Sequence, residues 1–135
     1  MPYWKLFYHI TWATKNRRPL IDPAWESSLH AAIVAKAKAL GAYVYAIGGI
    51  EDHVHLIASI PTSVLISKFI GQVKGNSSHF VNHEIVLDYH FSWQNEYGIV
   101  SFGQKQLDRV VKYTKNQRQH HQNNSIIPFL EKTEE

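Results

Sequence analysis

The chain has 135 residues, of which 44% are hydrophobic and 19% charged, with a formal net charge of +3 and no cysteine. This length and composition predict a single globular domain over residues 1–135. The absence of cysteine excludes disulfides, thiolate metal sites and cysteine nucleophiles. No apolar run reaches the roughly 18 residues that a bilayer-spanning helix needs, and the N-terminus does not resemble a signal peptide. We therefore expect a cytoplasmic protein without membrane contact.

The first predicted element is a strand over residues 3–14, along which side chains alternate between two faces. One face would carry Trp4, Leu6, Tyr8, Ile10 and Trp12, and the other Lys5, Phe7, His9 and Thr11. A basic loop follows over residues 15–18 and ends at Pro19. Its cationic side chains are Lys15, Arg17 and Arg18.

A helix is predicted to begin after Asp22, because an aspartate N-cap with proline next to it (Pro23) is a typical helix start. Gly41 is expected to end this helix, since glycine readily adopts the left-handed conformation of a helix C-terminus. The buried stripe would consist of Trp25, Leu29, Ile33 and Leu40.

Two paired strands are predicted next. Residues 42–50 form the first, in which the glycines at 48–49 indicate either a bulge or a close backbone approach. Residues 51–52 are short enough to be the tip of a hairpin. Residues 53–60 form the second strand.

This second strand carries the histidine pair of the chain. Because strand side chains alternate with period two, His53 and His55 point the same way while Val54 points into the core. Two imidazoles about 7 Å apart along a strand can reach one metal ion. The alternative is an ordinary amphipathic strand with two half-exposed histidines.

A second helix is predicted to open at residues 61–63 and to be buried through Leu65, Ile66, Phe69, Ile70 and Val73. Its other side carries small residues around Lys74, namely Ser67, Gly71 and Ser78. They permit the close approach of either another helix or a phosphate backbone. An irregular segment with interleaved aromatics (82–96), whose Trp93 we expect in the core, then leads into a fourth strand over residues 97–102.

After Gly103 a final helix is predicted from about residue 104 to 121, followed by a tail at about residues 122–135. Tyr113 and Gln117 lie four residues apart, hence on one face and about 6 Å apart along the axis. Cationic side chains gather on this helix: Lys105, Arg109, Lys112, Lys115 and Arg118. Such a run is usually a solvated face, but a tyrosine and an amide in a cationic field also suit a phosphodiester.

The order strand, helix, strand, strand, helix, strand predicts an α+β, ferredoxin-like βαββαβ fold. An antiparallel sheet would carry both helices on one face, with an additional C-terminal helix that bears the tyrosine. This fold hosts many functions and identifies none of them.

Tyrosine is a suitable nucleophile for reversible DNA cutting, because a phosphotyrosine bond conserves the energy needed for rejoining. Its pKa near 10 means that it needs nearby cations at neutral pH. Two neutral imidazoles and an amide oxygen would hold a divalent ion that offsets charge on the phosphate. Imidazole ligands fit manganese better than magnesium.

Residues 53–55, His-Val-His, resemble the HUH motif. Trp93-Gln94 with Tyr97-Gly98, and then residues 113–121, resemble the C-terminal signature of single-tyrosine HUH transposases. These are the TnpA-like enzymes of the smallest bacterial insertion sequences, with REP-associated tyrosine transposases as relatives. Residues 8–19 also resemble the family's first strand and basic loop. This sequence departs from the family pattern at two positions, Glu96 and Thr114.

The resemblance implies a metal-dependent nickase and strand transferase that acts on single-stranded, hairpin-bearing DNA. Tyr113 would attack the scissile phosphate, giving a 5′-phosphotyrosine and a free 3′-hydroxyl. His53, His55 and Gln117 would hold Mg²⁺ or Mn²⁺, with no small-molecule cofactor. The resemblance also implies a homodimer in which the C-terminal helix can be exchanged, with Gly103 as its hinge.

The residues expected to bind DNA are the basic ones of the loop, the second helix and the last helix: Lys15, Arg17, Arg18, Lys74, Lys105, Arg109, Lys112 and Lys115. We expect the remaining histidines of the second and last helices to be surface or supporting residues: His79, His83, His120 and His121.

Two other functions are open. One is a domesticated, regulatory module that binds a hairpin without cutting it. The other is a metal phosphoesterase that acts on small nucleotides through water and forms no protein adduct.

Overall fold

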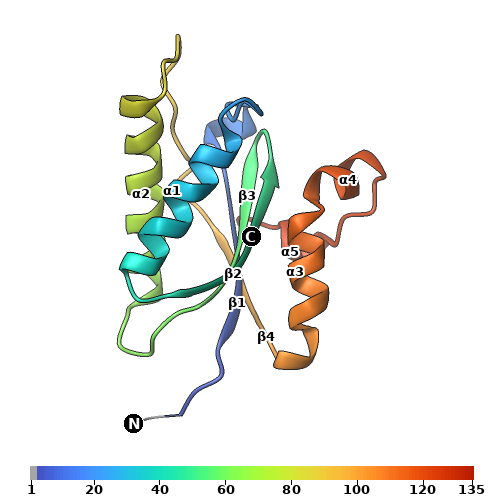
Figure 1. Ribbon diagram of the computed structural model, residues 1–135. Coiled ribbons are helices and arrows are strands. Elements are labelled where there is room, and N and C mark those ends of the chain that lie inside the picture. The colour runs from blue at the N-terminus through green and yellow to red at the C-terminus, as the bar shows by residue number, and fades with distance from the viewer. Residues whose placement is uncertain (1–2) are drawn as a thin grey trace.

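Four antiparallel strands form one sheet in the computed structural model, which describes residues 3–135 (Figure 1). Their spatial order is β2-β3-β1-β4, the order of a ferredoxin-like sheet. The strands are β1 (Phe7–Ala13), β2 (Tyr43–Ile50), β3 (His53–Ser59) and β4 (Gly98–Phe102). The predicted α+β fold class is therefore confirmed.

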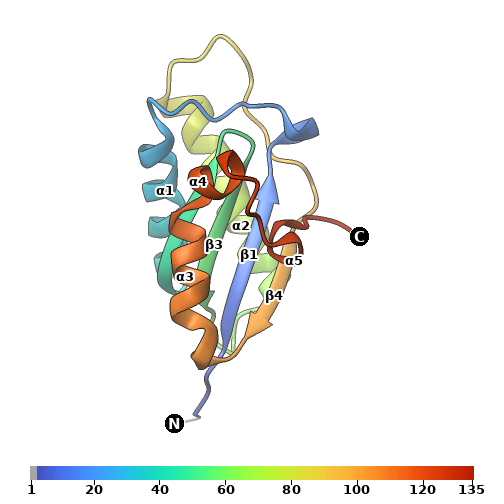
Figure 2. The same cartoon turned by 90° about the vertical axis from the view of Figure 1, so that its right-hand side faces the viewer.

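Helices cover both faces of this sheet (Figures 1 and 2). One face is covered by α1 (Glu26–Ala39) and α2 (Ile66–Glu84), and the other by α3 (Leu107–Lys115), α4 (Gln117–Gln122) and α5 (Pro128–Glu131). Short 3₁₀ turns lie at Lys15–Arg17 (η1) and Gln104–Gln106 (η2). Because β3 lies in the middle, every residue of this strand is buried.

The alternation along β1 and β3 sorts side chains between two packed layers. Ile10, Trp12 and Val54 point into the main core beneath α1 and α2. Ile57 packs on the opposite face with Val110 of α3. The first strand is shorter than predicted, since it begins at Phe7 rather than at residue 3.

The first helix starts later than predicted. The side chain of Asp22 accepts a hydrogen bond from the backbone N–H of Ala24 at 2.8 Å, but this closes a turn, and α1 begins at Glu26. Its end is as predicted, because Gly41 has a φ of +92°. The burial expected for Leu65 is wrong: it is 68% exposed, because it lies just before α2 begins.

The two glycines near the end of β2 allow a neighbouring backbone segment to approach the strand closely. The register shift of the β2–β3 pair falls between Val44 and Ala46, so no bulge lies at the glycines. Gly48 instead lies against the backbone of Thr114: a Cβ at this position would stand 1.9 Å from the Thr114 carbonyl oxygen. Gly49 has a φ of +157°. The prediction of a close backbone approach at these glycines is therefore confirmed.

The predicted last helix is interrupted at Asn116, whose φ and ψ are −107° and 29°. It consists of η2, α3 and α4, and the predicted single helix from residue 104 to 121 is wrong. The tail turns back across the sheet and forms α5, with Leu130 buried. Phe129 remains 65% exposed, so the tail docks through only part of its apolar side chains.

Candidate active site

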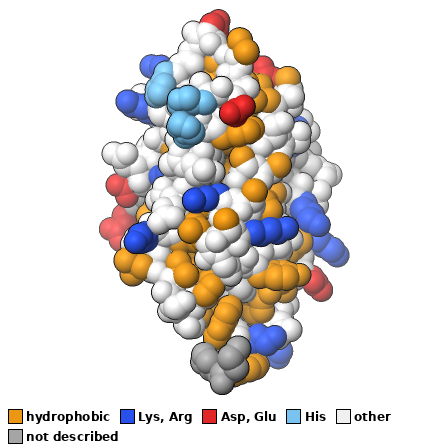
Figure 3. All heavy atoms as spheres, turned by 60° about the vertical axis from the view of Figure 1, so that its left-hand side comes forward, with side chains coloured by type: hydrophobic (Ala, Val, Ile, Leu, Met, Phe, Trp, Pro, Cys, Tyr) orange, Lys and Arg blue, Asp and Glu red, His pale blue; other side chains and the backbone are white. Residues whose placement is uncertain are grey.

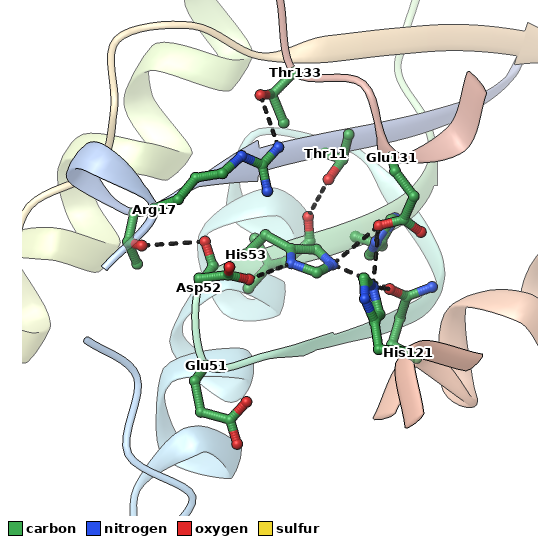
Figure 4. Close-up of polar contacts among 12 residues, drawn as sticks. Thr11, Arg17, Glu51, Asp52, His53, His121, Glu131 and Thr133 are labelled. Carbon is green, nitrogen blue, oxygen red and sulfur yellow. Dashed lines mark hydrogen bonds and ion pairs between the residues drawn. The ribbon is translucent and has the colours of Figure 1, made fainter. Parts of the chain in front are cut away.

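The two histidines of β3 lie on the sheet face that α3, α4 and α5 cover, where both contact Glu131 of α5; Figure 4 labels His53 in this site. Side-chain alternation places His53 and His55 on this face together, as predicted. They are 2% and 0% exposed, because the C-terminal helices close over them. The interpretation as an ordinary strand with half-exposed histidines is therefore wrong.

His55 forms a buried pair with a third histidine, His9 of β1. His9 Nε2 and His55 Nδ1 are 2.7 Å apart. Burial, and then the charge of His55, lowers the pKa of His9 to about 3, so its ring is neutral. When His55 Nδ1 donates the proton of this bond, His55 Nε2 presents a lone pair to the site. That nitrogen is buried and has no hydrogen-bond partner.

His53 is oriented by the hairpin tip. Its Nδ1 is 2.7 Å from Asp52 Oδ1, and its Nε2 is 3.1 Å from Gln117 Oε1. Burial opposes the charged imidazole, but the hydrogen bonds to Asp52, Glu131 and Gln117 raise the pKa of His53 to about 9. A carboxylate behind an imidazole is a common supporting contact of metal-binding histidines.

The break at Asn116 turns Gln117 into the site, where it is 1% exposed. Gln117 Nε2 donates to the Tyr113 backbone carbonyl at 3.4 Å, so its Oε1 faces the histidines. One turn further along α4, His121 Nε2 lies 3.1 Å from this same Oε1. His121 thus contacts the site through Gln117, which agrees with the supporting role expected for it.

Tyr113 lies beside the histidines of its own subunit, with its ring centroid 6.1 Å from that of His55. Its hydroxyl donates to Glu131 Oε2 and accepts from the backbone N–H of Ile127 at 3.0 Å. Burial and the bond to Glu131 raise the pKa of Tyr113 to about 12. In this arrangement the phenol is held protonated.

Glu131 links the phenol to the imidazoles, and the sequence analysis missed it. Its Oε1 lies 3.2 Å from His53 Nε2 and 3.3 Å from His55 Nε2. The apolar residues of the tail and the proline at the start of α5 could have predicted a short helix docked on the sheet. Such a helix would bring the carboxylate of Glu131 to the sheet. His9 was also missed, although the strand alternation places it on the same side of β1 as Phe7 and Thr11.

The basic residues predicted to bind DNA lie in separate parts of the structure. Arg109 and Lys112 border a groove of about 660 Å³ whose lining includes part of the buried Tyr113. Arg17 instead donates to the Thr133 hydroxyl at 3.2 Å, which ties the tail to the basic loop (Figure 4). The other predicted basic residues of the loop and α3 region are exposed: Lys15, Arg18, Lys105 and Lys115. On the face in Figure 3, Lys and Arg side chains are scattered among apolar ones.

Lys74 is held by the loop that precedes β4. Its ammonium donates to the backbone carbonyls of Gln94 at 2.5 Å, Asn95 at 3.2 Å and Glu96 at 3.0 Å. It borders a groove of about 390 Å³ on the face opposite the histidines. Lys74 therefore fixes this loop, and DNA contact by its ammonium stays a prediction. Trp93 in the same segment is 9% exposed, as expected for a core residue.

The sheet is ferredoxin-like and carries a His-Val-His pair on a central strand, which faces Tyr113 of α3 and Gln117 of α4. This arrangement is that of the single-tyrosine HUH transposases. Comparison with protein families agrees: the family described as "Transposase IS200 like" matches residues 2–117. The chain belongs to this IS200-like transposase family. A comparison with curated proteins returned no match.

Two solved structures share the fold. One is a candidate transposase from Deinococcus radiodurans R1, with 21% identity and a TM-score of 0.67, covering 93% of this chain and 95% of that one. The other is a REP-associated tyrosine transposase bound to a REP hairpin, with 16% identity and a TM-score of 0.65, covering 93% of this chain and 76% of that one. In the described part of the chain, none of the helices is long and apolar enough to cross a membrane.

Proposed function

We propose that this transposase nicks and rejoins single-stranded, hairpin-bearing DNA through a 5′-phosphotyrosine on Tyr113. The observation that carries the proposal is that Tyr113 and the pair His53 and His55 meet in one buried site within a single subunit. One carboxylate, that of Glu131, contacts the Tyr113 hydroxyl and both imidazoles and so joins the phenol to the histidine pair. The hairpin substrate is supported by the similar structure that is described as bound to a REP hairpin.

The donor atoms of the site fit a divalent ion, Mg²⁺ or Mn²⁺. His55 Nε2 is buried without a hydrogen-bond partner, and Gln117 Oε1 faces His53 Nε2. His53, His55 and Gln117 would hold the ion, which when bound would offset the negative charge on the non-bridging phosphate oxygens.

The remaining steps belong to the chain's own side chains. The hydroxyl of Tyr113 must leave its bond to Glu131 and lose its proton before its oxygen attacks the phosphorus. A P–O bond to Tyr113 forms, the bond to the 3′ oxygen breaks, and that oxygen takes up a proton to become a 3′-hydroxyl. Arg109 and Lys112, which border the groove in front of Tyr113, would bind the phosphate and stabilise the phenolate.

Rejoining reverses these steps with a 3′-hydroxyl as the attacking group and the phenol of Tyr113 as the leaving group. A homodimer that exchanges its C-terminal helix remains part of the proposal, with Gly103 before η2 as the hinge. Since Tyr113 already reaches the histidines of its own subunit, exchange would replace one complete site by an equivalent one.

The test is to incubate the protein and Mn²⁺ with labelled single strands from its own flanking DNA, followed by a denaturing gel. The wild-type protein should give a covalent adduct, and Tyr113→Phe should give none while still shifting the hairpin in a native gel. Tyr43→Phe, at an exposed tyrosine of β2, is the matched control and should form the adduct normally. An adduct on Tyr113→Phe would contradict the proposal.

One observation favours the alternative of a hairpin-binding module that does not cut. The Tyr113 hydroxyl is bonded on both sides, by Glu131 and by Ile127, and its pKa is raised to about 12. The same assay decides between the two functions, because a module of this kind would shift the hairpin but give no adduct with the wild-type protein.

A further inference from the structure

Two side chains of the site come from beyond the segment that matches the family. That match ends at residue 117. His121 of α4 and Glu131 of α5 follow it in sequence and point toward His53 (Figure 4). Their contacts with the site therefore call for a physical account of their own.

The polar atoms of these side chains converge on one point. Glu131 Oε1 is 3.2 Å from His53 Nε2, 3.3 Å from His55 Nε2 and 3.2 Å from His121 Nε2. Gln117 Oε1 is 3.1 Å from the Nε2 atoms of His53 and His121. Ligand atoms that each lie about 2.0–2.2 Å from one ion are themselves about 3–3.5 Å apart. The separations between the two oxygens and the imidazole nitrogens have this size, and His53, His55 and Glu131 each offer a ligand atom within 4.8 Å of the others.

One buried nitrogen of this cluster has no hydrogen-bond partner in the structure. A neutral imidazole has one N–H, and His55 shares its Nδ1 with His9. His55 Nε2 is then left buried without a hydrogen-bond partner, although Glu131 Oε1 is only 3.3 Å away. A buried polar atom without a partner is costly. A cation between the imidazoles and the carboxylate would satisfy this atom and compensate the charge of Glu131, whose side chain is 13% exposed.

We propose that Glu131 is a further ligand of the ion held by His53, His55 and Gln117, so that the C-terminal part adds a carboxylate to the centre. This inference rests on the metal site of the proposed function. Two imidazoles favour a transition-metal ion such as Mn²⁺, Co²⁺ or Zn²⁺ over Mg²⁺, which prefers oxygen ligands and keeps several waters. Since Glu131 Oε2 accepts from the Tyr113 hydroxyl, the ion and the nucleophile share one side chain.

The docking of α5 gives the carboxylate its position. Leu130 is buried beside Glu131, and Thr133 accepts a hydrogen bond from Arg17. Glu131 is therefore held from both sides by contacts that do not involve the site. Substitution of its carboxylate should leave α5 docked, which makes the contribution of this group to metal binding measurable.

The experiment is calorimetric titration of the DNA-free protein with Mn²⁺ and, separately, with Mg²⁺. We expect Glu131→Gln to lower the Mn²⁺ affinity by about tenfold or more, and His53→Ala to lose binding. Glu134→Gln, in the same tail, and His83→Asn, on the surface of α2, are the matched controls and should bind like the wild type. Circular dichroism melts with a chelator present identify any variant that fails to fold.

Each outcome has a distinct meaning. Weaker Mn²⁺ binding by folded Glu131→Gln, with unchanged controls, supports the inference. Equal binding by Glu131→Gln, together with loss in His53→Ala, overturns the inference but leaves the proposed metal site intact. Tighter binding by Glu131→Gln also overturns it, since the carboxylate would then compete for the position of the ion. If the wild-type protein binds none of the ions, the metal site of the proposed function fails as well.

Discussion

The absence of a side chain at Gly48 lets the carbonyl oxygen of Thr114 come so close to β2 that a Cβ would stand 1.9 Å from it. This contact seats α3 on the sheet and brings Tyr113, the neighbour of Thr114, to the histidines. We predict that Gly48→Ala lowers the free energy of unfolding by about 1–3 kcal/mol, because backbone rather than a flexible side chain must move. Urea denaturation measures the change.

Gly71 of α2 provides the matched control, because a Cβ there meets nothing within 4 Å. Gly71→Ala should raise the free energy of unfolding by up to about 1 kcal/mol, the helix-propensity difference between the two residues. If both alanine variants changed stability in the same direction, the account of the Gly48 contact would be wrong.

Lys74 is predicted to hold the segment before β4. Lys74→Met removes the donor to three backbone carbonyls and should lower the free energy of unfolding by about 1–2 kcal/mol. Hydrogen exchange of residues 94–96 should become faster. Lys68→Met, at an exposed position of the same helix, is the control. Unchanged exchange in Lys74→Met would show that the loop holds its shape without the ammonium.

His9 is predicted to position His55 for metal binding. His9→Phe removes the partner of His55 Nδ1 and frees the imidazole to turn, so the Mn²⁺ affinity should fall by about tenfold to a hundredfold. Calorimetry of the DNA-free protein measures the effect, with the exposed His90→Phe as control. An unaltered affinity in His9→Phe would mean that the strand alone fixes His55.

His30 of α1 gives a pH dependence of stability that is remote from the site. Burial lowers its pKa from 6.5 to about 4 in the folded protein. Between these two pH values the unfolded chain binds a proton that the folded protein does not, so stability decreases as the pH falls from about 6.5 to about 4.

The slope contributed by His30 is at most about 1.4 kcal/mol per pH unit, and solvent screening reduces it because the ring is partly exposed. Urea unfolding of wild type and His30→Gln at several pH values checks this. The curve of the variant should be flatter between pH 6.5 and 4, whereas parallel curves would exclude His30 as the source.

Local rules were sufficient for one part of the site. The alternation of a strand placed His53 and His55 on one face. Helical spacing placed Tyr113 and Gln117 together, although the helix is interrupted between them at Asn116. Both rules depend only on neighbours within about one helical turn or two strand residues. The end of the first helix at Gly41 could likewise be predicted, because the positive φ found there depends only on the residue's own backbone.

Other features depend on which distant segments meet. The contact of Gly48 with Thr114, the pairing of His9 with His55 and the docking of Glu131 each join positions far apart in sequence. No local periodicity encodes such pairs, because they arise only when layers pack on both faces of the sheet.

The amino-acid sequence by itself therefore determined the order of the elements, the direction of the histidine pair and the family resemblance, since these follow from short-range patterns. Only the tertiary structure decided that the tail returns to the sheet and that a carboxylate joins the imidazoles and the phenol. The physical reason is that burial of apolar residues such as Leu130 selects where the tail packs, and Glu131 is carried into the site by that packing.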